Sequence, residues 1–593
     1  MTHPAMASSA DYLPTVTSTA PQFDPVKFEV IRNALSEVTE EMGLALRRSA
    51  YSTNIKTRGD YSCVIFDSKL RFVASNFAQA THLGSMVEMV PRSIEAFGVK
   101  SLAPGDGILT NHPYLGGVHL NDVCLISPLY SDGQLYGYLA NIAHHVDVGG
   151  GAPASLGAFR EIYQEGVIIP PVKVIKDGEV LPDILALVLA QIRSERETSG
   201  DLRAQMAANR IGAKRMGDLL ERYGLETVTQ HIDELIAYTE RRTAASLRAL
   251  PIGVYRADGL VDSDGFSDDP VRLVVAVTID EDGVFFDFAG SDPQRRAPIN
   301  STRAQTLSAC AYVLKCLTDS DIPTNHGFYR FLRMHAPVGS VLNCTPPAPV
   351  VGGFETHARL IDIIFKALAS ALPQRLPAGT KGMMCQVGFG GVNPESGEYQ
   401  CFYEALGGGY GGRWASDGPD AVQTHGQNTE NAPIEEVESN YPVQITQYCL
   451  VDDSDGPGEF RGGLGLRRDY RLQTDVTFTL LADRDREGPH GLFGGLPGKR
   501  AEYVLNPDGE ARRLPSKATI ELRGGDVVSY RTCGGGGYGP PFRRDPARVL
   551  DDVRNGKVSA ARATSVYGVE LTPDTVAVDV ERTQALRDAD DRS

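Results

Sequence analysis

Two short groups of imidazole and carboxylate side chains lie close together in the N-terminal part of the sequence. His119 and Asp122 come just before one predicted strand, and His144, His145 and Asp147 come just after the next. Neutral imidazole and carboxylate are side chains that bind Zn, Mn and Fe(II) in proteins. These residues therefore predict a site for one divalent metal, with ordinary surface or core histidines as the alternative. Glycines beside both groups would let the backbone approach a ligand closely: Gly116, Gly117, Gly149, Gly150 and Gly151.

The chain between the two groups predicts a β-hairpin that would bring them together. Residues 131–133, with the sequence Ser-Asp-Gly, are a strong turn signal between two apolar segments. Folding there puts residue 122 opposite about residue 143, and residue 119 opposite about residue 146. Directly opposed Cβ atoms are about 5 Å apart, so the two groups are expected to meet at the open end of the hairpin.

Asp60 is a further candidate ligand. It begins the first strand of an earlier predicted hairpin, in the segment Arg58-Gly59-Asp60-Tyr61-Ser62. It can supply a carboxylate to the metal, and a turn aspartate that caps the start of the strand is the alternative. Five of the chain's 12 histidines lie at residues 82–145. This concentration favours a common site over unrelated positions for these histidines.

Two glycine runs match the dinucleotide-binding pattern only in form. Neither run lies in a strand–glycine–helix unit with a downstream acid, which argues against a Rossmann domain. The sequence contains no GxxxxGK[ST] motif and no GxSxG nucleophile elbow. We therefore expect no ATP hydrolysis by a P-loop in this chain. The two runs are Gly407-x-Gly409-x-x-Gly412 and Gly534-x-Gly536-x-x-Gly539.

The composition is that of a soluble globular protein, with 593 residues of which 42% are hydrophobic and 22% charged. The net charge of −17 opposes binding to nucleic-acid phosphates and to anionic membranes. The first part of the chain lacks a signal-peptide pattern, and no segment approaches the roughly 18 apolar residues of a membrane span. Nine scattered cysteines without a CxxC pair are typical of reduced thiols. We expect a cytoplasmic protein that binds neither nucleic acid nor membrane.

Hydrophobic periodicity predicts an α+β protein of two or three lobes, with mixed helices, antiparallel hairpins and Gly-rich regions of short strands. Asp24 and Pro25 form a helix start, followed by an apolar face to about Arg48. The other expected elements are hairpins at 61–66/70–74, 123–130/134–143 and 271–279/284–288, helices at 86–97, within 180–250, at 302–317 and at 358–371, and a last short helix from Asp545-Pro546.

Changes in this pattern divide the chain into five predicted regions. They are a disordered tail (1–22), an N-terminal α+β metal-binding region (23–250), a middle α+β region (251–374), a Gly-rich C-terminal region that contains β-strands (375–580) and a second disordered tail (581–593).

Long segments of the chain, in order, carry a family resemblance. NHPYLGGVHLNDV (111–123) and AHHVDVGG (143–150) lie at the predicted hairpin, and they closely resemble the hydantoinase B family. That family includes the second half of 5-oxoprolinase and the α subunits of acetone carboxylase. Such a series of motifs is highly specific for the family and much less specific for substrate. The likeness extends through 23–67, 161–174, 200–212, 457–472 and 533–569.

The resemblance implies a division of labour between subunits. A hydantoinase A-like partner with an actin-like ATPase fold would use ATP to phosphorylate the carbonyl or enolate oxygen of the substrate. The subunit seen here would receive the activated intermediate at a metal. In hydrolytic relatives water then attacks the activated amide carbon, and in carboxylase relatives a carbanion equivalent joins CO₂. A hetero-oligomer is therefore expected.

The resemblance also implies a metal set. His119 and Asp122 match the HxxD metal pair of the family, and His144 matches the histidine after the second strand. Asp60 matches the acid of an RxDFS-like segment, in which Tyr61 replaces the more usual Phe. The expected ligands of a Zn, Mn or Fe ion are thus Asp60, His119, Asp122 and His144.

The expected function is ATP-dependent hydrolysis of a cyclic amide, of the hydantoinase, N-methylhydantoinase, oxoprolinase or lactamase type. Asp147 or Glu165 would take the proton of the attacking water. His145 and Asp147 can instead ligate the metal or orient its imidazoles, and a structural ion pair is the alternative for Glu165. Two other functions remain open: the α subunit of an ATP-dependent ketone carboxylase, and a scaffold that only holds the ATPase. The length of 593 residues, shorter than the acetone carboxylase type, favours the hydrolase.

Overall fold

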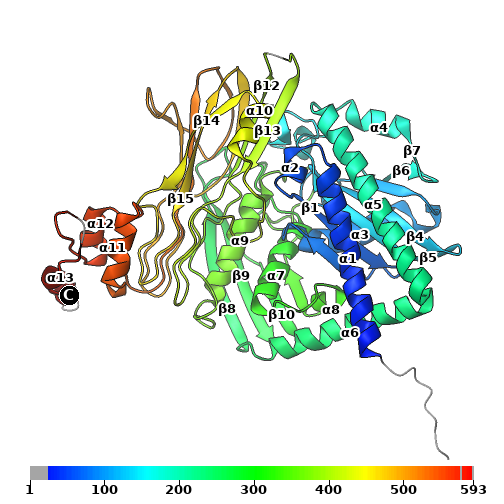
Figure 1. Cartoon of the computed structure of the whole chain (residues 1–593), viewed down its shortest axis with the longest axis horizontal. Helices are drawn as coiled ribbons and strands as arrows, with labels where there is room; N and C mark the ends of the chain where they lie inside the picture. Colours follow the sequence, from blue (N-terminus) through cyan, green and yellow to red (C-terminus); the bar gives the residue numbers. More distant parts are fainter. Residues whose placement is uncertain (1–23, 395, 575–576, 591–593) are drawn as a thin grey trace, which may run out of the picture.

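The computed structural model describes residues 24–394, 396–574 and 577–590. It is an α+β structure in which mixed helices and mainly antiparallel sheets form several lobes (Figure 1). The tail expected at residues 1–22 lies outside the described residues. No described helix is both long and apolar enough to cross a membrane.

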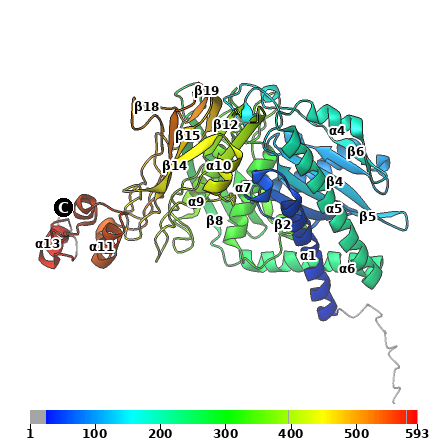
Figure 2. The ribbon, with the colours of Figure 1, turned by 45° about the horizontal axis from the view of Figure 1, so that its top comes forward.

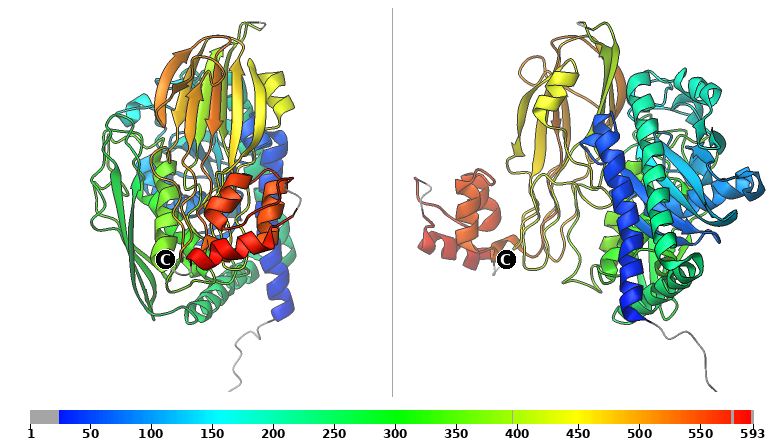
Figure 3. Two further views of the ribbon diagram at one scale, coloured as in Figure 1. Left: turned by 90° about the vertical axis from the view of Figure 1, so that its left-hand side faces the viewer. Right: turned by 45° about the vertical axis from the view of Figure 1, so that its right-hand side comes forward.

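The N-terminal lobe is a seven-stranded sheet with helices on both faces. Its elements are α1 (Pro25–Ser49), β1 (Tyr61–Asp67), β2 (Phe72–Phe77), α3 (His82–Phe97), β3 (Gly107–Thr110), β4 (Asp122–Ser131), β5 (Gln134–His144), β6 (Val172–Lys176), β7 (Glu179–Val180), α5 (Glu195–Tyr223) and α6 (Leu225–Leu247). The strands follow the order β2-β1-β5-β4-β3-β6-β7, and each pair is antiparallel. One face packs against α3 and the other against α1, α5 and α6. Figure 3 shows α1 and α5 side by side along the sheet.

Alternation along the strands decides which residues lie on which face, because successive side chains of a strand point to opposite sides. Val64 and Phe66 of β1 pack with α3, whereas Cys63 and Ile65 pack with α1 and α5. In β5, Ile142 likewise lies on the α3 face. The even-numbered residues of these strands therefore face α3.

Helix α1 begins as the sequence predicted. The Asp24 side chain accepts hydrogen bonds from the backbone N–H groups of Val26 and Lys27, which caps the first turn. The apolar stripe is buried, and each such side chain contributes on the order of 2 kcal/mol. Its members are Phe28, Ile31, Leu35, Val38, Met42 and Leu46.

The middle lobe is a four-stranded sheet covered by two helices. It contains β8 (Gly253–Val261), β9 (Val271–Asp280), β10 (Gly283–Asp287), α7 (Arg303–Leu317), β11 (Leu332–His335) and α9 (Gly353–Leu368). The order is β11-β10-β9-β8, with a parallel β10–β11 pair and antiparallel pairs elsewhere in this sheet. Both helices pack into one apolar core with the sheet.

The C-terminal lobe is a sandwich of two antiparallel sheets around a shared core. One sheet has the order β13-β12-β16-β19: β12 (Gln386–Val392), β13 (Tyr399–Ala405), β16 (Val476–Leu481) and β19 (Lys517–Leu522). The other has the order β14-β15-β20-β17-β18: β14 (Val443–Val451), β15 (Gly465–Leu472), β17 (Glu502–Leu505), β18 (Arg512–Arg513) and β20 (Val527–Arg531). Short helices elsewhere are α2 (Thr53–Lys56), α4 (Pro182–Leu189), α8 (His326–Tyr329) and α10 (Ile434–Asn440).

Glycine-rich segments extend from the sandwich towards the last helices (Figures 2 and 3). They pack backbone against backbone: the Gly409 N–H donates to the Cys533 carbonyl at 3.0 Å, and the Gly535 N–H donates to the Gly463 carbonyl at 2.9 Å. A Cβ atom on Gly535 would overlap the carbonyl oxygen of Tyr410. The glycine clusters are therefore explained by close packing of main chains, without a nucleotide.

Two helices follow the one that the sequence predicted as last. After α11 (Pro546–Arg554) come α12 (Ala560–Tyr567) and α13 (Val580–Asp590). The prediction of a disordered tail is therefore wrong for residues 581–590. Tertiary hydrogen bonds hold this polar helix: Thr583 accepts from the Glu570 N–H at 3.1 Å, and Arg587 donates to the Arg544 carbonyl at 2.7 Å. Such contacts leave no hydrophobic periodicity in the sequence.

The glycine packing predicts that Gly535→Ala severely destabilises or prevents folding, because the new methyl group meets rigid main chain rather than a movable side chain. Gly217→Ala is the matched control, since a Cβ there, inside α5, meets nothing within 4 Å. It should stabilise the helix by roughly 0.5–1 kcal/mol. Urea unfolding of the two variants measures the difference. A Gly535→Ala protein as stable as wild type would contradict the packing.

Candidate metal centre

The β4–β5 hairpin sets the register of the site. The structure pairs Asp122 with His144, one residue beyond the predicted partner at about 143. A register shift at Leu129/Tyr130 explains the difference, because an extra residue of β5, Tyr136, is accommodated there as a bulge. Asp122 and His144 thus lie directly opposite each other, on the α3 face of the sheet.

Three of the predicted ligands converge. Asp122 Oδ2 lies 3.5 Å from His119 Nε2, and Asp122 Oδ1 lies 3.4 Å from His144 Nδ1. The three ligand atoms lie within 4.8 Å of one another, and all three side chains are buried. The imidazole rings of His119 and His144 are 4.8 Å apart between centroids.

Asp60 lies beside this group. Strand β1 pairs with β5, and the His144 N–H donates to the Asp60 carbonyl at 3.1 Å. The side chain of Asp60 reaches the same edge, with Oδ2 4.0 Å from His144 Nδ1. The structure therefore brings the four predicted metal residues to one place, with Asp60 at its margin.

The electrostatics of the group suit a cation. Burial opposes ionisation of Asp122, but the imidazoles of His119, His144 and His82 hold the pKa of its carboxyl well below the usual range. Burial lowers the pKa of His119 to about 4, which keeps that ring neutral. Four buried atoms have no hydrogen-bond partner among the described residues: both oxygens of Asp122, Nε2 of His119 and Nε2 of His144. A carboxylate that faces imidazole nitrogens is a ligand set for a divalent metal.

The sequence did not single out His82. Helix α3 begins at His82, whereas its apolar spacing predicted a start near residue 86. The ring is fully buried, with Nδ1 2.8 Å from Ser62 Oγ and Nε2 3.8 Å from Asp122 Oδ2. The sequence did show a concentration of histidines at residues 82–145, but it did not indicate that His82 would lie next to Asp122.

The walls of the site come from the other lobes. The Tyr403 ring of β13 stacks on His144 at 5.0 Å with an interplanar angle of 19°, and Phe354 of α9 meets His119 edge-on at 4.8 Å. The guanidinium carbon of Arg58 lies 4.7 Å from the centre of the Tyr403 ring. Contacts between segments so distant in sequence cannot be predicted from local sequence patterns.

His145 and Asp147 have other partners. His145 is odd-numbered and follows β5, and its Nε2 lies 3.0 Å from Gln205 Oε1 of α5, on the face opposite α3. Asp147 Oδ1 accepts from the backbone N–H groups of Gly149 and Arg193, and its Oδ2 pairs with Arg193 Nη1 at 3.0 Å. Asp147 therefore fixes the glycine loop after β5.

Glu165 is a buried carboxyl with one free oxygen. Its Oε1 accepts from the N–H groups of Val350 and Val351 at 2.7 and 2.8 Å, and its Oε2 has no partner among the described residues. Burial raises the pKa of Glu165 to about 8, although these two hydrogen bonds oppose the rise. Such a carboxyl can exchange a proton near neutral pH.

A second carboxylate group is already neutralised by cations. Asp262, Asp483 and Asp485 lie within metal-binding distance of one another. However, Lys517 Nζ is 3.3 Å from Asp483 Oδ1, and Arg359 also pairs with Asp483. Asp483 and Asp262, which also pairs with Arg359, therefore take part in structural ion pairs.

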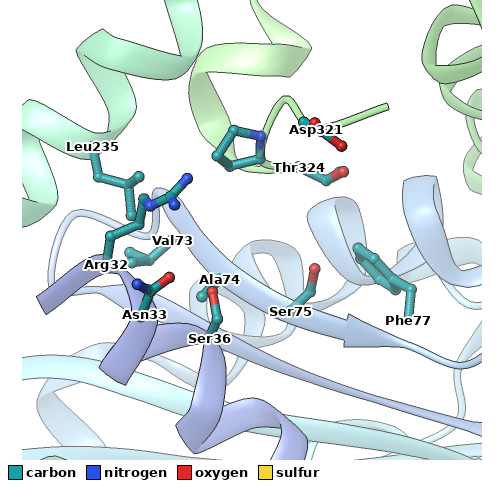
Figure 4. Close-up of a pocket in the computed structure, with 11 residues that line it drawn as sticks. Arg32, Asn33, Ser36, Val73, Ala74, Ser75, Phe77, Leu235, Asp321 and Thr324 are labelled. Atoms are coloured by element: carbon teal, nitrogen blue, oxygen red, sulfur yellow. The ribbon is translucent and has the colours of Figure 1, made fainter. Parts of the chain in front are cut away.

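Two cavities of the structure are lined by different sets of residues. Figure 4 shows a cavity between α1, β2 and residues 321–324. Its volume is about 390 Å³, and none of the predicted site residues lines it. A larger cavity of about 970 Å³ is lined in part by Arg193 and Cys401. Tyr403, which stacks on His144, is not among the residues that line this cavity.

The chain is similar to known proteins over nearly all of its length. The family model described as Hydantoinase B/oxoprolinase matches residues 24–541. An uncharacterised protein of Methanocaldococcus jannaschii is 38% identical over 95% of this chain and 100% of that protein. A Pseudomonas protein provisionally named as the B-type subunit of a D-/L-hydantoinase is 33% identical over 95% of this chain and 98% of its own length. The 5-oxoprolinase 1 of Arabidopsis thaliana is 32% identical over 87% of this chain, which spans 42% of that protein.

Two solved structures have a similar fold. The ATP-dependent caprolactamase from Pseudomonas jessenii superposes with a TM-score of 0.88 and 29% identity, over 95% of this chain and 100% of that one. A nucleotide-free acetone carboxylase superposes with a TM-score of 0.88 and 20% identity, over 96% of this chain and 83% of that one. At 20% identity, the likeness to the acetone carboxylase shows a shared fold alone.

The raised pKa of Glu165 predicts a pH-dependent stability difference. The folded carboxyl stays protonated to about pH 8, whereas in the unfolded chain it ionises above about 4.3. Wild type should therefore lose stability relative to Glu165→Gln as the pH rises through this window, by an amount on the order of a few kcal/mol. Urea unfolding of both proteins between pH 5 and 8 measures it. Parallel pH profiles would show that Glu165 is ionised in the folded protein.

Proposed function

Because the chain belongs to the hydantoinase B/oxoprolinase family, we propose that it is the metal-binding subunit of an ATP-dependent enzyme that hydrolyses a cyclic amide. One observation carries the metal role: the buried Asp122 carboxylate lies 3.5 Å from His119 Nε2 and 3.4 Å from His144 Nδ1, and among the described residues neither Asp122 oxygen nor His119 Nε2 has a hydrogen-bond partner. Cyclic amides are proposed because the hydantoinase and caprolactamase relatives each match 95% of the chain.

A separate ATPase subunit is part of the proposal. The sequence has no P-loop motif, yet the caprolactamase relative is ATP-dependent by name and the hydantoinase relative is named as one subunit of its enzyme. A hydantoinase A-like partner would therefore phosphorylate the amide oxygen, in a cytoplasmic hetero-oligomer. The nine free cysteines in the described part of the chain fit a reducing compartment.

The proposal assigns metal binding and proton transfer to different residues. Asp60, His119, Asp122 and His144 would hold a Zn, Mn or Fe(II) ion, which when bound supplies Lewis-acid activation of water or substrate. Glu165 would accept and return a proton, since its pKa lies near neutrality. The initial expectation also allowed Asp147 this role, but Arg193 and two backbone N–H groups already occupy both its oxygens.

A ketone carboxylase α subunit is the second candidate, because the acetone carboxylase shares the fold. The hydrolase is preferred on coverage and identity: this chain spans all of the caprolactamase chain at 29% identity, and 83% of the carboxylase chain at 20%. A scaffold without chemistry is disfavoured by the converged set of buried ligand side chains.

Purified wild-type protein should contain about one divalent Zn, Mn or Fe ion per chain. His119→Ala removes a buried nitrogen that faces Asp122, so metal affinity should fall by at least about tenfold. His335→Ala, at an exposed histidine paired with Asp287, is the control and should keep its metal. Elemental analysis after gel filtration gives the stoichiometry. No metal in wild type, or full content in His119→Ala, would rule the site out.

With its ATPase partner, the complex should couple ATP consumption to ring opening of a hydantoin or lactam without bicarbonate. Amide resonance makes the carbonyl a poor electrophile, and O-phosphorylation supplies a better leaving group. Asp122→Asn should stop ring opening and leave partner ATP turnover possible, whereas Asp268→Asn, with a side chain 98% exposed, should behave as wild type.

The assay is mass spectrometry of a substrate panel with and without ¹³C-bicarbonate: hydantoins, 5-oxoproline, caprolactam, acetone and acetophenone. Label in a ketone product, with every cyclic amide inert, would reject the hydrolase in favour of the carboxylase. Rapid ATP hydrolysis by the isolated chain would contradict the need for a partner.

A further inference from the structure

We propose that His82 is a fifth ligand of the metal, and that the site therefore favours ions of octahedral geometry, such as Mn²⁺ or Fe²⁺, over tetrahedral Zn²⁺. This inference rests on the proposed metal site at Asp60, His119, Asp122 and His144. It adds one side chain to that set and narrows the choice of metal.

The position of His82 is fixed by its surroundings. It lies in the first turn of α3, on the sheet face that carries Asp122 and His144, and none of its surface is exposed. Close packing holds that turn in place: the Gly84 N–H donates to Ser308 Oγ at 2.8 Å, and a Cβ on Gly84 would overlap the backbone of α7. The ring cannot turn towards solvent.

The hydrogen-bond network assigns the tautomer of His82. Ser62 Oγ donates its hydrogen to the Tyr61 carbonyl at 2.8 Å. The same oxygen can therefore only accept from His82, whose Nδ1 lies 2.8 Å away. Nδ1 carries the proton, and Nε2 presents a lone pair. That lone pair lies 3.8 Å from Asp122 Oδ2.

The same reasoning applies to His119. The amide nitrogen of Asn121 donates to the carbonyls of His145 and Ala154. The amide oxygen of Asn121 therefore accepts from His119 Nδ1 at 3.2 Å, and His119 Nε2 presents its lone pair 3.5 Å from Asp122 Oδ2. His82 and His119 thus both present an Nε2 lone pair to the same carboxylate oxygen, at 3.8 and 3.5 Å.

Acceptors that face one another in a buried site are stabilised by a cation between them. Among the described residues, the Nε2 atoms of His82 and His119 and both oxygens of Asp122 have no hydrogen-bond donor. Burying a carboxylate without a partner is costly. A divalent ion in the shared space would turn these repulsive contacts into coordination bonds.

The ligand count points to the class of metal. Asp60, His82, His119, Asp122 and His144 offer three imidazole nitrogens and two carboxylates. Zn²⁺ in catalytic sites most often takes three protein ligands and one open position. Five protein ligands with one position left for substrate suit the six-coordinate ions of N,O sites.

The direct test counts the coordinated imidazoles in the wild-type chain. Mn(II)-loaded protein with ¹⁵N-histidine is examined by electron spin echo envelope modulation. We expect three coupled imidazole nitrogens in wild type and two in His82→Ala. Two in wild type would refute the role of His82 while leaving the site itself intact. Failure of wild type to bind Mn(II), Fe(II) or Zn(II) would instead refute the proposed metal site.

Metal titrations give an independent readout. His82→Ala should weaken Mn²⁺ binding about tenfold to a hundredfold and Zn²⁺ binding less, so the ratio of the two dissociation constants changes. His357→Ala is the matched control, since His357 is a buried histidine of α9 whose Nδ1 lies 3.0 Å from the Gln305 carbonyl oxygen, outside the metal group. It should leave both affinities unchanged. Equal losses for Mn²⁺ and Zn²⁺ in His82→Ala would overturn the preference for octahedral ions.

Discussion

The carboxylate of Asp122 is buried at the end of a β-hairpin, and no donor among the described residues satisfies either of its oxygens. An uncompensated buried charge is among the more costly features that a folded protein can retain. Three imidazoles surround it within 3.8 Å, and their free nitrogens are acceptors rather than donors where the network assigns them. A divalent cation at the proposed site would make the arrangement favourable. The surrounding structure serves to hold these groups in place.

The N-terminal lobe and the C-terminal lobe both hold the groups around Asp122 in place. The N-terminal sheet supplies Asp60, Asp122 and His144 from strands that pair with each other. Histidines that bind a metal are commonly oriented by a hydrogen bond at the other ring nitrogen, and Asn121 Oδ1 lies 3.2 Å from Nδ1 of His119, a proposed ligand. His144 Nε2 has no such partner among the described residues, and its ring is instead flanked by His119 and by Tyr403 of the C-terminal sandwich. The orientation of this proposed ligand therefore depends on the packing of the C-terminal sandwich against the N-terminal lobe.

The parts that sequence analysis predicted correctly are governed by local rules. The turn at Asp132-Gly133 fixed the hairpin, and the Asp24 cap fixed the start of α1. The β-bulge near Tyr130 shifted the register by one residue, and nothing in the turn signal indicates an extra residue in β5.

The features that the sequence did not predict depend on tertiary contacts. The place of His82 depends on α3 packing against α7, and the role of Asp147 depends on Arg193, just before α5. Helix α13 depends on hydrogen bonds from Arg587 to main-chain carbonyls. Such contacts between residues far apart in sequence have no periodic signature, so their absence from the prediction has a physical reason.

The most direct test of the metal site is anomalous X-ray diffraction from crystals of the chain purified without chelator, recorded on both sides of the Mn, Fe and Zn absorption edges. We predict one strong peak about 2.0–2.3 Å from the facing atoms of His119, Asp122 and His144. No peak at this group, or a peak only among Asp262, Asp483 and Asp485, would contradict the proposed site.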